Sequence, residues 1–260
     1  MDSDGKIMKN IRYSKLISFL ILIVFLVIWQ FASTNTKFEF LFGSPASISS
    51  ALVEGTLSGV LPYHFLITGA EASLGFVIGI VLGTITGFLL WYSPLVARVS
   101  RPYISFLGAI PVFAFAPMVI IWFGIGFSMK VALAAFAVFL VALAQAYEGA
   151  KSVDEEEYRL LKTFGATRFQ MFQKVIFPAS LSWVFASMRL NVGFAILGAF
   201  IGEFISSNEG LGHFMIKAGS LFDIPSVFAG GLYLVLLSIM LTWLVSNIEK
   251  NRIKIIDSLS

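Results

Sequence analysis

Three charged side chains stand inside long apolar stretches of this 260-residue sequence and are its strongest candidates for a chemical role: Glu71, Arg189 and Glu203. A charged group in an apolar environment is costly, so it marks either a solute pathway or a specific ion pair. Both interpretations stay open for Arg189. Glu71 lies four residues before Gly75, on the same helix face, which predicts that it faces protein. Glu71 and Glu203 are expected near the outer ends of their helices, too far from the deeper Arg189 for a simple ion pair.

Sets of residues typical of catalysis are missing from the sequence. It has no Gly-x4-Gly-Lys-Ser/Thr phosphate loop, no Gly-x-Ser-x-Gly elbow and no His-Glu-x-x-His motif. The two histidines, His64 and His213, are too few and too far apart to suggest a metal centre. The absence of cysteine excludes disulfides and thiolate metal sites. The chain is therefore expected not to be an enzyme and to need no cofactor or metal.

The composition predicts an all-α, polytopic membrane protein. Hydrophobic residues make up 58% of the chain and charged residues only 13%, and about 20 apolar residues suffice to cross a bilayer. Six transmembrane helices are expected in one domain over residues 1–260, with a polar loop at 148–178. The predicted spans are residues 16–32, 65–91, 103–123, 130–147, 179–204 and 227–247.

The distribution of lysine and arginine sets the expected orientation. Fourteen of these residues fall on the side that holds both termini and the 148–178 loop, against three on the other side: Lys37, Lys130 and Lys217. Positive charge concentrates on the cytoplasmic side of membrane proteins. Both termini and the loop are therefore predicted to be cytoplasmic in a multi-pass protein of the cell inner membrane. This topology also explains the positive charge without nucleic-acid binding.

The polar loop contains two sequence patterns for helix starts with a glycine between them. Ser152 to Glu155 and Thr167 to Gln170 each fit a capping box, in which two side chains satisfy each other's free amides. Gly165 lies between them, where helices often end in a left-handed residue. Pro178 fits the first position of a new helix, where no amide is needed. The loop is therefore predicted as helix, glycine turn, helix, proline and membrane helix.

Two spans carry further patterns. In 65–91 glycine recurs every fourth residue, which predicts a stripe of close helix contact: Gly75, Gly79, Gly83 and Gly87. The stripe fits static packing, and it also fits a surface on which helices slide. In 103–123, Pro111 and Pro117 each remove a backbone hydrogen bond. They predict either a fixed bend or a hinge that gates the pathway.

The loop also resembles a family signature. Gly165 followed by nine residues and Val175-Ile176-Phe177-Pro178 resembles the cytoplasmic motif of bacterial ABC-importer permease subunits: Glu-Ala-Ala, three residues, Gly, nine residues, Ile-x-Leu-Pro. Arg159-Leu160-Leu161 replaces the Glu-Ala-Ala part. Three further stretches resemble the nitrate, sulfonate and taurine branch of these permeases: 108–126, Arg189 with Leu190, and Glu209-Gly210-Leu211-Gly212.

This resemblance implies partners and residue roles. The chain would form a homodimer in membrane lipid, with two ATP-binding cassette ATPase subunits on the loop and an extracytoplasmic substrate-binding protein outside. The implied ATPase-coupling residues are Asp154, Glu155, Arg159, Leu160, Leu161, Phe164, Gly165, Ala166 and Pro178. The implied translocation path contains Arg189, Glu71, Glu203, Pro111 and Pro117.

An arginine in the path suits a small anionic solute of the sulfonate, taurine, nitrate or bicarbonate type. Glu71 would not favour an anion, so a pyrimidine or vitamin-precursor substrate remains an alternative. A stand-alone secondary transporter or channel, which needs no ATPase, is the alternative from another class.

Overall fold

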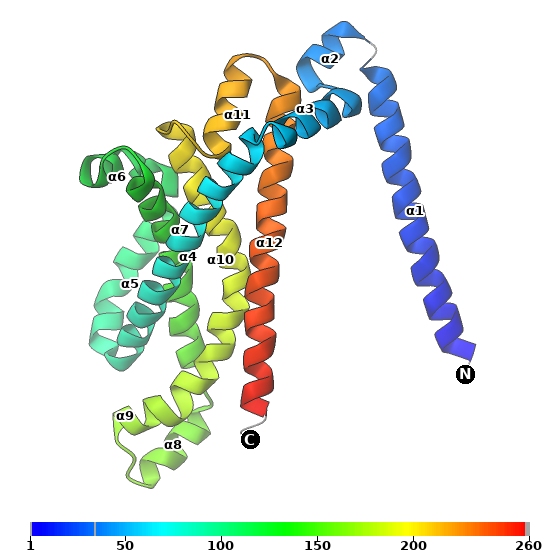
Figure 1. Ribbon diagram of the computed structural model, residues 1–260. Helices are drawn as coiled ribbons and strands as arrows, with labels where there is room; N and C mark the ends of the chain where they lie inside the picture. The colour runs from blue at the N-terminus through cyan, green and yellow to red at the C-terminus, as the bar shows by residue number, and fades with distance from the viewer. Residues whose placement is uncertain (1, 34, 258–260) are drawn as a thin grey trace. The chain divides into compact units, whose positions relative to one another are not determined.

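The computed structural model describes residues 2–33 and 35–257, and within them the side chains of 13–14, 16–33, 35, 37–154, 156 and 158–250. These described residues form helices and connecting turns, with no strand among them (Figure 1). The chain divides into two compact units, Met1–Leu61 with Met215–Gly231 and Pro62–Phe214 with Leu232–Ser260. α11 (Leu211–Ser220) and α12 (Ile224–Asp257) contribute residues to both units.

The first unit holds α1 (Asp2–Ala32), α2 (Thr36–Phe42) and α3 (Pro45–Leu57). Ser44 starts α3 with a capping box, because its hydroxyl accepts from Ser47 N–H and the Ser47 hydroxyl accepts from Ser44 N–H. The Gly43 carbonyl before this cap accepts from Trp29 Nε1 at 3.2 Å and from Ser33 Oγ at 2.8 Å. These bonds hold the start of α3 against the end of α1.

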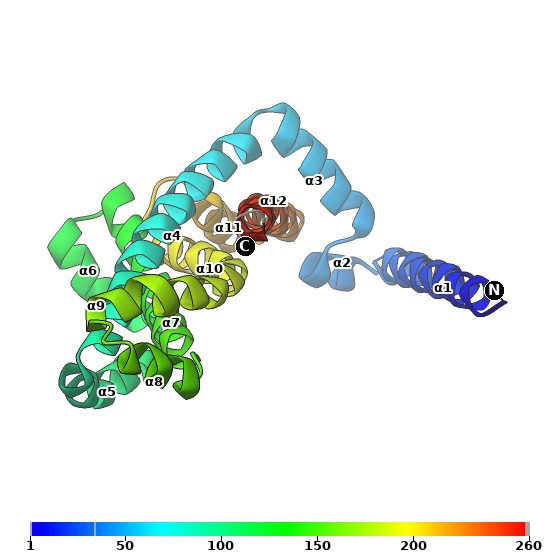
Figure 2. The same ribbon diagram turned by 90° about the horizontal axis from the view of Figure 1, so that it is seen from below.

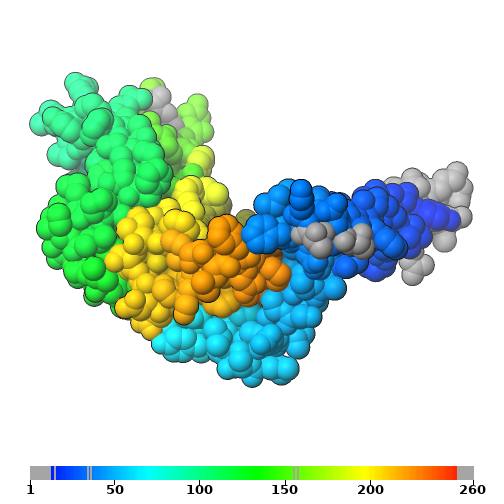
Figure 3. All heavy atoms as spheres, turned by 90° about the horizontal axis from the view of Figure 1, so that it is seen from above, coloured from blue at the N-terminus to red at the C-terminus, as the bar shows by residue number. Residues whose placement is uncertain are grey.

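The second unit is built on α4 (Val60–Tyr92), α7 (Phe127–Lys151) and α10 (Phe177–Ile205). α7 and α10 pack together. Seen from above, the green surface of the region of α7 and α6 (Ala116–Phe123) borders the yellow surface at the end of α10 (Figure 3). The glycine stripe of α4 faces α7. A Cβ atom on Gly79 would lie 2.6 Å from the Ala135 carbonyl oxygen, and one on Gly87 would lie 2.6 Å from that of Leu143. Only glycine lets the two backbones approach this closely.

The predicted third span is not one kinked helix. It consists of α5 (Pro94–Ala109), a 3-10 turn (Val112–Phe115) and α6 (Ala116–Phe123), with a bend of 97°. The residue before a proline avoids helical geometry, and Ile110 is extended with ψ 127°. Pro117 lies in the first turn of α6, where proline is tolerated, so only Pro111 breaks the helix. The predicted start of this span at residue 103 is also wrong. The helix begins earlier, because Ser93 caps α5 and Pro94 is its first residue.

The polar loop contains α8 (Glu155–Thr163) and α9 (Arg168–Met171), as predicted, but two of its details differ. Asp154, not Ser152, is the N-cap of α8; Ser152 ends α7. Pro178 lies in the first turn of α10, close to its predicted position, but a π-helical turn (Phe172–Ile176) joins this helix directly to α9. Proline cannot donate to the carbonyl four residues earlier, and the wider turn accommodates this loss.

Four helical stretches among the described residues are long and apolar enough to cross a membrane. They are Val60–Tyr92, Phe127–Lys151, Arg168–Ile205 and Ile224–Lys250. The bent pair Pro94–Ala109 and Val112–Phe123 makes a fifth if it counts as one span. Leu16–Ala32 is a shorter apolar stretch within α1. The chain is therefore a multi-pass, all-α membrane protein.

Candidate functional site

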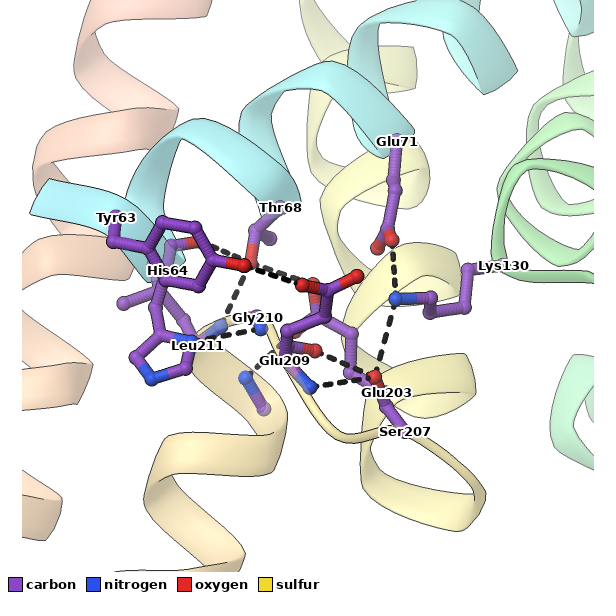
Figure 4. A network of polar contacts seen from close by, with 11 residues as sticks. Tyr63, His64, Thr68, Glu71, Lys130, Glu203, Ser207, Glu209, Gly210 and Leu211 are labelled. Carbon is purple, nitrogen blue, oxygen red and sulfur yellow. Dashed lines mark hydrogen bonds and ion pairs between the residues drawn. The ribbon is translucent and has the colours of Figure 1, made fainter. Parts of the chain in front are cut away.

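Polar side chains of the second unit gather where α10 ends and the chain continues through residues 206–212 (Figure 4). We call this set the polar network. Four of its side chains, Thr68, Glu71, Lys130 and Glu203, are at most 2% exposed. Such burial is favourable only when the polar atoms find partners. The network comprises Tyr63, His64, Thr68, Glu71, Lys130, Glu203, Ser207, Glu209, Gly210, Leu211 and Gly212.

Lys130 is the cation of the network. Its ammonium group forms an ion pair with the Glu71 carboxylate and donates to Ser207 Oγ at 3.1 Å. Gly202 of α10 makes room for the lysine, since a Cβ atom there would lie 2.9 Å from Lys130 Cγ. Lys130, which was counted among the basic residues on the outer side, is therefore buried within α7 rather than exposed. Its long stem packs inside the helix bundle and carries the charge to a buried acid.

Glu203 is the second buried acid. One carboxylate oxygen accepts from the Thr68 hydroxyl and the other from Gly212 N–H, both at 2.6 Å. Gly210 passes directly beside this carboxylate with φ +101°, so neither the space nor the backbone conformation there suits a side chain. Glu203 therefore joins α4, α10 and the start of α11 at one point.

Three consecutive backbone N–H groups, those of Gly210, Leu211 and Gly212, are each held by a different side chain. His64 Nδ1 accepts the first at 2.9 Å, Thr68 Oγ1 the second at 2.8 Å and Glu203 the third. The Tyr63 hydroxyl adds a hydrogen bond to Glu209 at 2.6 Å. The sequence analysis assigned no role to His64 or Thr68, although both lie on the Glu71 face of α4, seven and three residues before it.

The polar network is suited to holding a segment in place rather than to bond chemistry. It contains three carboxylates and one ammonium group, but no nucleophile paired with a base. Its hydrogen bonds fix residues 206–212 against α4 and α10. A buried network of this kind favours one arrangement, because the alternatives separate Glu71 from Lys130 and leave buried charges unpaired.

A second candidate site lies at the other end of the same helices. The segment from Asp154 to Ile176, which we call the elbow, projects beyond the lower ends of α4 and α7 (Figure 1). In the view from below, α8 and α9 lie nearest to the viewer (Figure 2). Gly165 has φ +76°, and its N–H donates to the Lys162 carbonyl while Ala166 N–H donates to the Leu161 carbonyl. These two bonds define a Schellman motif that ends α8. Thr167 and Gln170 form the predicted capping box of α9.

The elbow exposes large apolar side chains. Leu160 is 58% exposed, Phe164 78% and Phe169 62%. Its charged side chains include Asp154, which accepts from Glu156 N–H at 3.0 Å. The side chain of Glu155, another predicted coupling residue, lies outside the described residues. A short, polar-rimmed segment with exposed apolar residues is typical of a protein contact surface.

Arg189 occupies neither candidate site. It is half exposed rather than buried, and its Nε lies 3.5 Å from a carboxylate oxygen of Glu249 on α12. Arg189 makes no ion pair with Glu71, and this agrees with the prediction that the two residues are too far apart. The other predicted residues fall at three places. The four glycines of the stripe lie on α4 where it meets α7, and Glu71 and Glu203 belong to the polar network. Pro111 and Pro117 lie on either side of the 3-10 turn.

A groove of about 710 Å³ lies between α4, α5, α6 and α7. Its lining is almost entirely apolar, and six of the sixteen lining residues are aromatic, among them Phe115, Trp122 and Phe136. Gly79 of the stripe also lines it, and the break at Pro111 places the 3-10 turn beside it. Such a surface can receive apolar or flat groups by stacking.

Comparisons with known proteins identify the class. The family described as binding-protein-dependent transport system inner membrane component matches residues 75–254. The formylaminopyrimidine transport permease ThiX of Halalkalibacterium halodurans is 33% identical, over 88% of this chain and 91% of the relative. The taurine transport system permease TauC of Escherichia coli is 27% identical, over 80% and 78% respectively.

A solved structure shares the fold. An inward-facing form of the MetNI methionine ABC transporter matches 72% of this chain and 94% of its own, with a TM-score of 0.65 and 16% identity. The fold and the sequence matches together define the class of protein. This chain belongs to the family of inner-membrane permease subunits of binding-protein-dependent ABC importers.

Proposed function

We propose that this permease forms the translocation path for a small anionic solute of the sulfonate, taurine, nitrate or bicarbonate type. An external binding protein delivers the solute, two copies of the chain form the path, and two ATPase subunits drive it. The taurine permease among the relatives supports this substrate class. Arg189 supports it as well, because its guanidinium is half exposed and has further N–H groups, besides the Nε that faces Glu249, to offer an oxyanion.

The proposed topology has six spans, with both termini and the elbow in the cytoplasm and residues 1–260 forming one permease domain. The bent pair of α5 and α6 counts as one span, and Leu16–Ala32 as another. The charge imbalance supports this orientation. Because Lys130 is buried in the bundle, only Lys37 and Lys217 remain of the three basic residues assigned to the outer side.

The observation that carries the proposal is the apolar surface of the elbow. Leu160 and Phe164 stand mostly exposed on a segment that projects beyond the lower ends of α4 and α7 (Figure 1). Lipid cannot cover them if the elbow lies in the cytoplasm, so a partner protein is expected there. A stand-alone transporter would have no use for such a surface.

A pyrimidine or vitamin-precursor substrate is the second candidate. The 33% identical relative is named for formylaminopyrimidine. The aromatic groove suits a flat ring, and Glu249 offsets the charge of Arg189. Uptake of labelled taurine would favour the first candidate, whereas uptake of a formylaminopyrimidine alone would favour the second.

If the elbow is the ATPase contact, a substitution on its apolar surface should weaken binding of the ATPase subunits, whereas a similar substitution elsewhere should not. Leu160→Glu places a charge in the proposed contact and should reduce the ATPase that co-purifies with the permease at least tenfold. Leu57→Glu, on α3, is the matched control, because Leu57 is 83% exposed and lies outside the elbow. Affinity purification from membranes that contain the ATPase subunits measures both. Equal recovery of ATPase with both variants would reject the elbow as the contact.

A further inference from the structure

The elbow is tied to α4 by a cluster of rings around one arginine. The guanidinium of Arg168, at the start of α9, lies 5.3 Å from the ring centre of Tyr92 and 5.8 Å from that of Trp91. These are the last two residues of α4. A guanidinium at this distance from ring faces is held by cation–π attraction, and Arg168 here contacts two rings.

Phenylalanines extend this cluster. Phe172 lies 5.8 Å from Trp91 and 5.4 Å from Phe88, and Phe177 lies 5.7 Å from Phe88, all measured between ring centres. The last turn of α4 therefore contacts α9, the π-helical turn and the first turn of α10. We call Phe88, Trp91, Tyr92, Arg168, Phe172 and Phe177 the clamp.

The connection from the elbow to α10 is different in kind. It passes through the π-helical turn Phe172–Ile176, where the regular hydrogen-bond spacing is interrupted. Such turns are sites where helices bend. When the elbow is displaced, the π-helical turn can bend, so only part of the displacement reaches α10. The clamp has no such turn between the elbow and α4, so it transmits the displacement to α4.

α4 is a suitable rigid element for carrying this displacement. It is continuous from Val60 to Tyr92, and its glycine stripe packs directly on the α7 backbone. Its other end bears Thr68 and Glu71 of the polar network. From Phe88 to Glu71 the helix spans about 26 Å at 1.5 Å per residue. The clamp and the polar network thus lie at opposite ends of one helix.

We propose that Arg168 is a coupling residue that transmits movement of the elbow to α4. This inference rests on the proposed function, in which the elbow receives the ATPase. It adds a specific role: Arg168 acts on the permease side of that contact, by holding the elbow to the rings of α4, and not by binding the ATPase.

The test follows movement at the far end of α4. The sequence has no cysteine, so Leu66→Cys, at a residue 69% exposed on α4, accepts a single environment-sensitive fluorophore. The permease is reconstituted in nanodiscs with its ATPase subunits. The fluorescence change upon ATP addition and the rate of ATP hydrolysis are then measured in the same sample.

Arg168→Ala should reduce the ATP-dependent fluorescence change at least fivefold while ATPase recovery and hydrolysis stay within twofold of the parent. Arg168→Lys should restore most of the change, because a lysine still places a cation over the rings. Tyr92→Leu should reproduce the loss while leaving Arg168 intact, and Arg98→Ala, on α5, should change nothing.

Two results would overturn the role of Arg168. An unaltered fluorescence change in Arg168→Ala or in Tyr92→Leu shows that the clamp carries no movement. Loss of ATPase recovery in Arg168→Ala shows instead that the arginine is part of the ATPase contact. If no ATPase subunit co-purifies even with the parent protein, the proposed function itself fails. This result is distinct from the other two.

Discussion

Replacing Lys130 with methionine is expected to destabilise the folded permease by about 3–5 kcal/mol, the usual effect of removing one partner of a buried ion pair. Lys130 and Glu71 are 2% and 0% exposed, so Lys130→Met leaves a buried carboxylate without its cation. It also removes the hydrogen bond to Ser207. For a chain of this size the thermal midpoint should fall by roughly 10 °C in detergent. Differential scanning fluorimetry of the purified protein measures the shift.

The pairing itself is tested by adding Glu71→Gln. The double variant leaves no unpaired charge at this position and should recover more than half of the lost stability. Lys217→Met is the matched control, since Lys217 is exposed on α11 and its replacement should alter the midpoint by less than 2 °C or so. A double variant as unstable as Lys130→Met would mean that the ion pair is not the source of the loss.

Gly165→Val is expected to reduce ATP-driven uptake at least tenfold while the protein remains folded in the membrane. Gly165 has φ +76°, a conformation that costs other residues about 1–2 kcal/mol and a β-branched residue more. No atom lies within 4 Å of the position of a Cβ there, so steric overlap is not the cause. Valine would shift the chain out of this conformation and change the angle between α8 and α9.

The matched variant for this position is Gly165→Asn. Asparagine tolerates the left-handed conformation, so it should keep more than half of the uptake while adding a side chain of similar size. Uptake into proteoliposomes, together with ATP hydrolysis in the same preparation, separates the two variants. Equal uptake by the valine and asparagine variants would show that the conformation of Gly165 is not needed.

Local sequence patterns predicted much of the fold because they depend on neighbouring residues. The helix-ending conformation of Gly165 and the capping box of Thr167 follow from residues within one turn. The glycine stripe was readable because four glycines at a spacing of four must share a face, and the structure shows α7 as the helix they meet. Hydropathy located the long helices because only apolar stretches can lie in a bilayer.

Features that depend on distant partners could not be predicted in this way. Lys130 stands at the start of an apolar stretch, where a lysine normally faces water; its burial depends on Glu71, 59 residues away, and on the space left by Gly202. Two prolines in one predicted span looked equivalent, but only Pro111 breaks the helix because Pro117 falls in a first turn. Asp154 replaced Ser152 as a cap because α7 continues to Lys151.

The position of the elbow is the central claim, and chemical labelling tests it most directly. Because the chain has no cysteine, Lys162→Cys provides a single thiol on the exposed side of α8. Lys217→Cys, on α11, is the control, because the proposed topology puts α11 on the opposite face of the membrane. A maleimide that cannot cross the membrane is applied to right-side-out and to inside-out vesicles, with and without bound ATPase subunits.

We predict that the thiol at 162 reacts only in inside-out vesicles, and that bound ATPase subunits reduce the reaction at least fivefold. The thiol at 217 should react only in right-side-out vesicles, whether or not the ATPase is present. Reaction at 162 from the outside, or undiminished reaction when the ATPase is bound, would contradict the account.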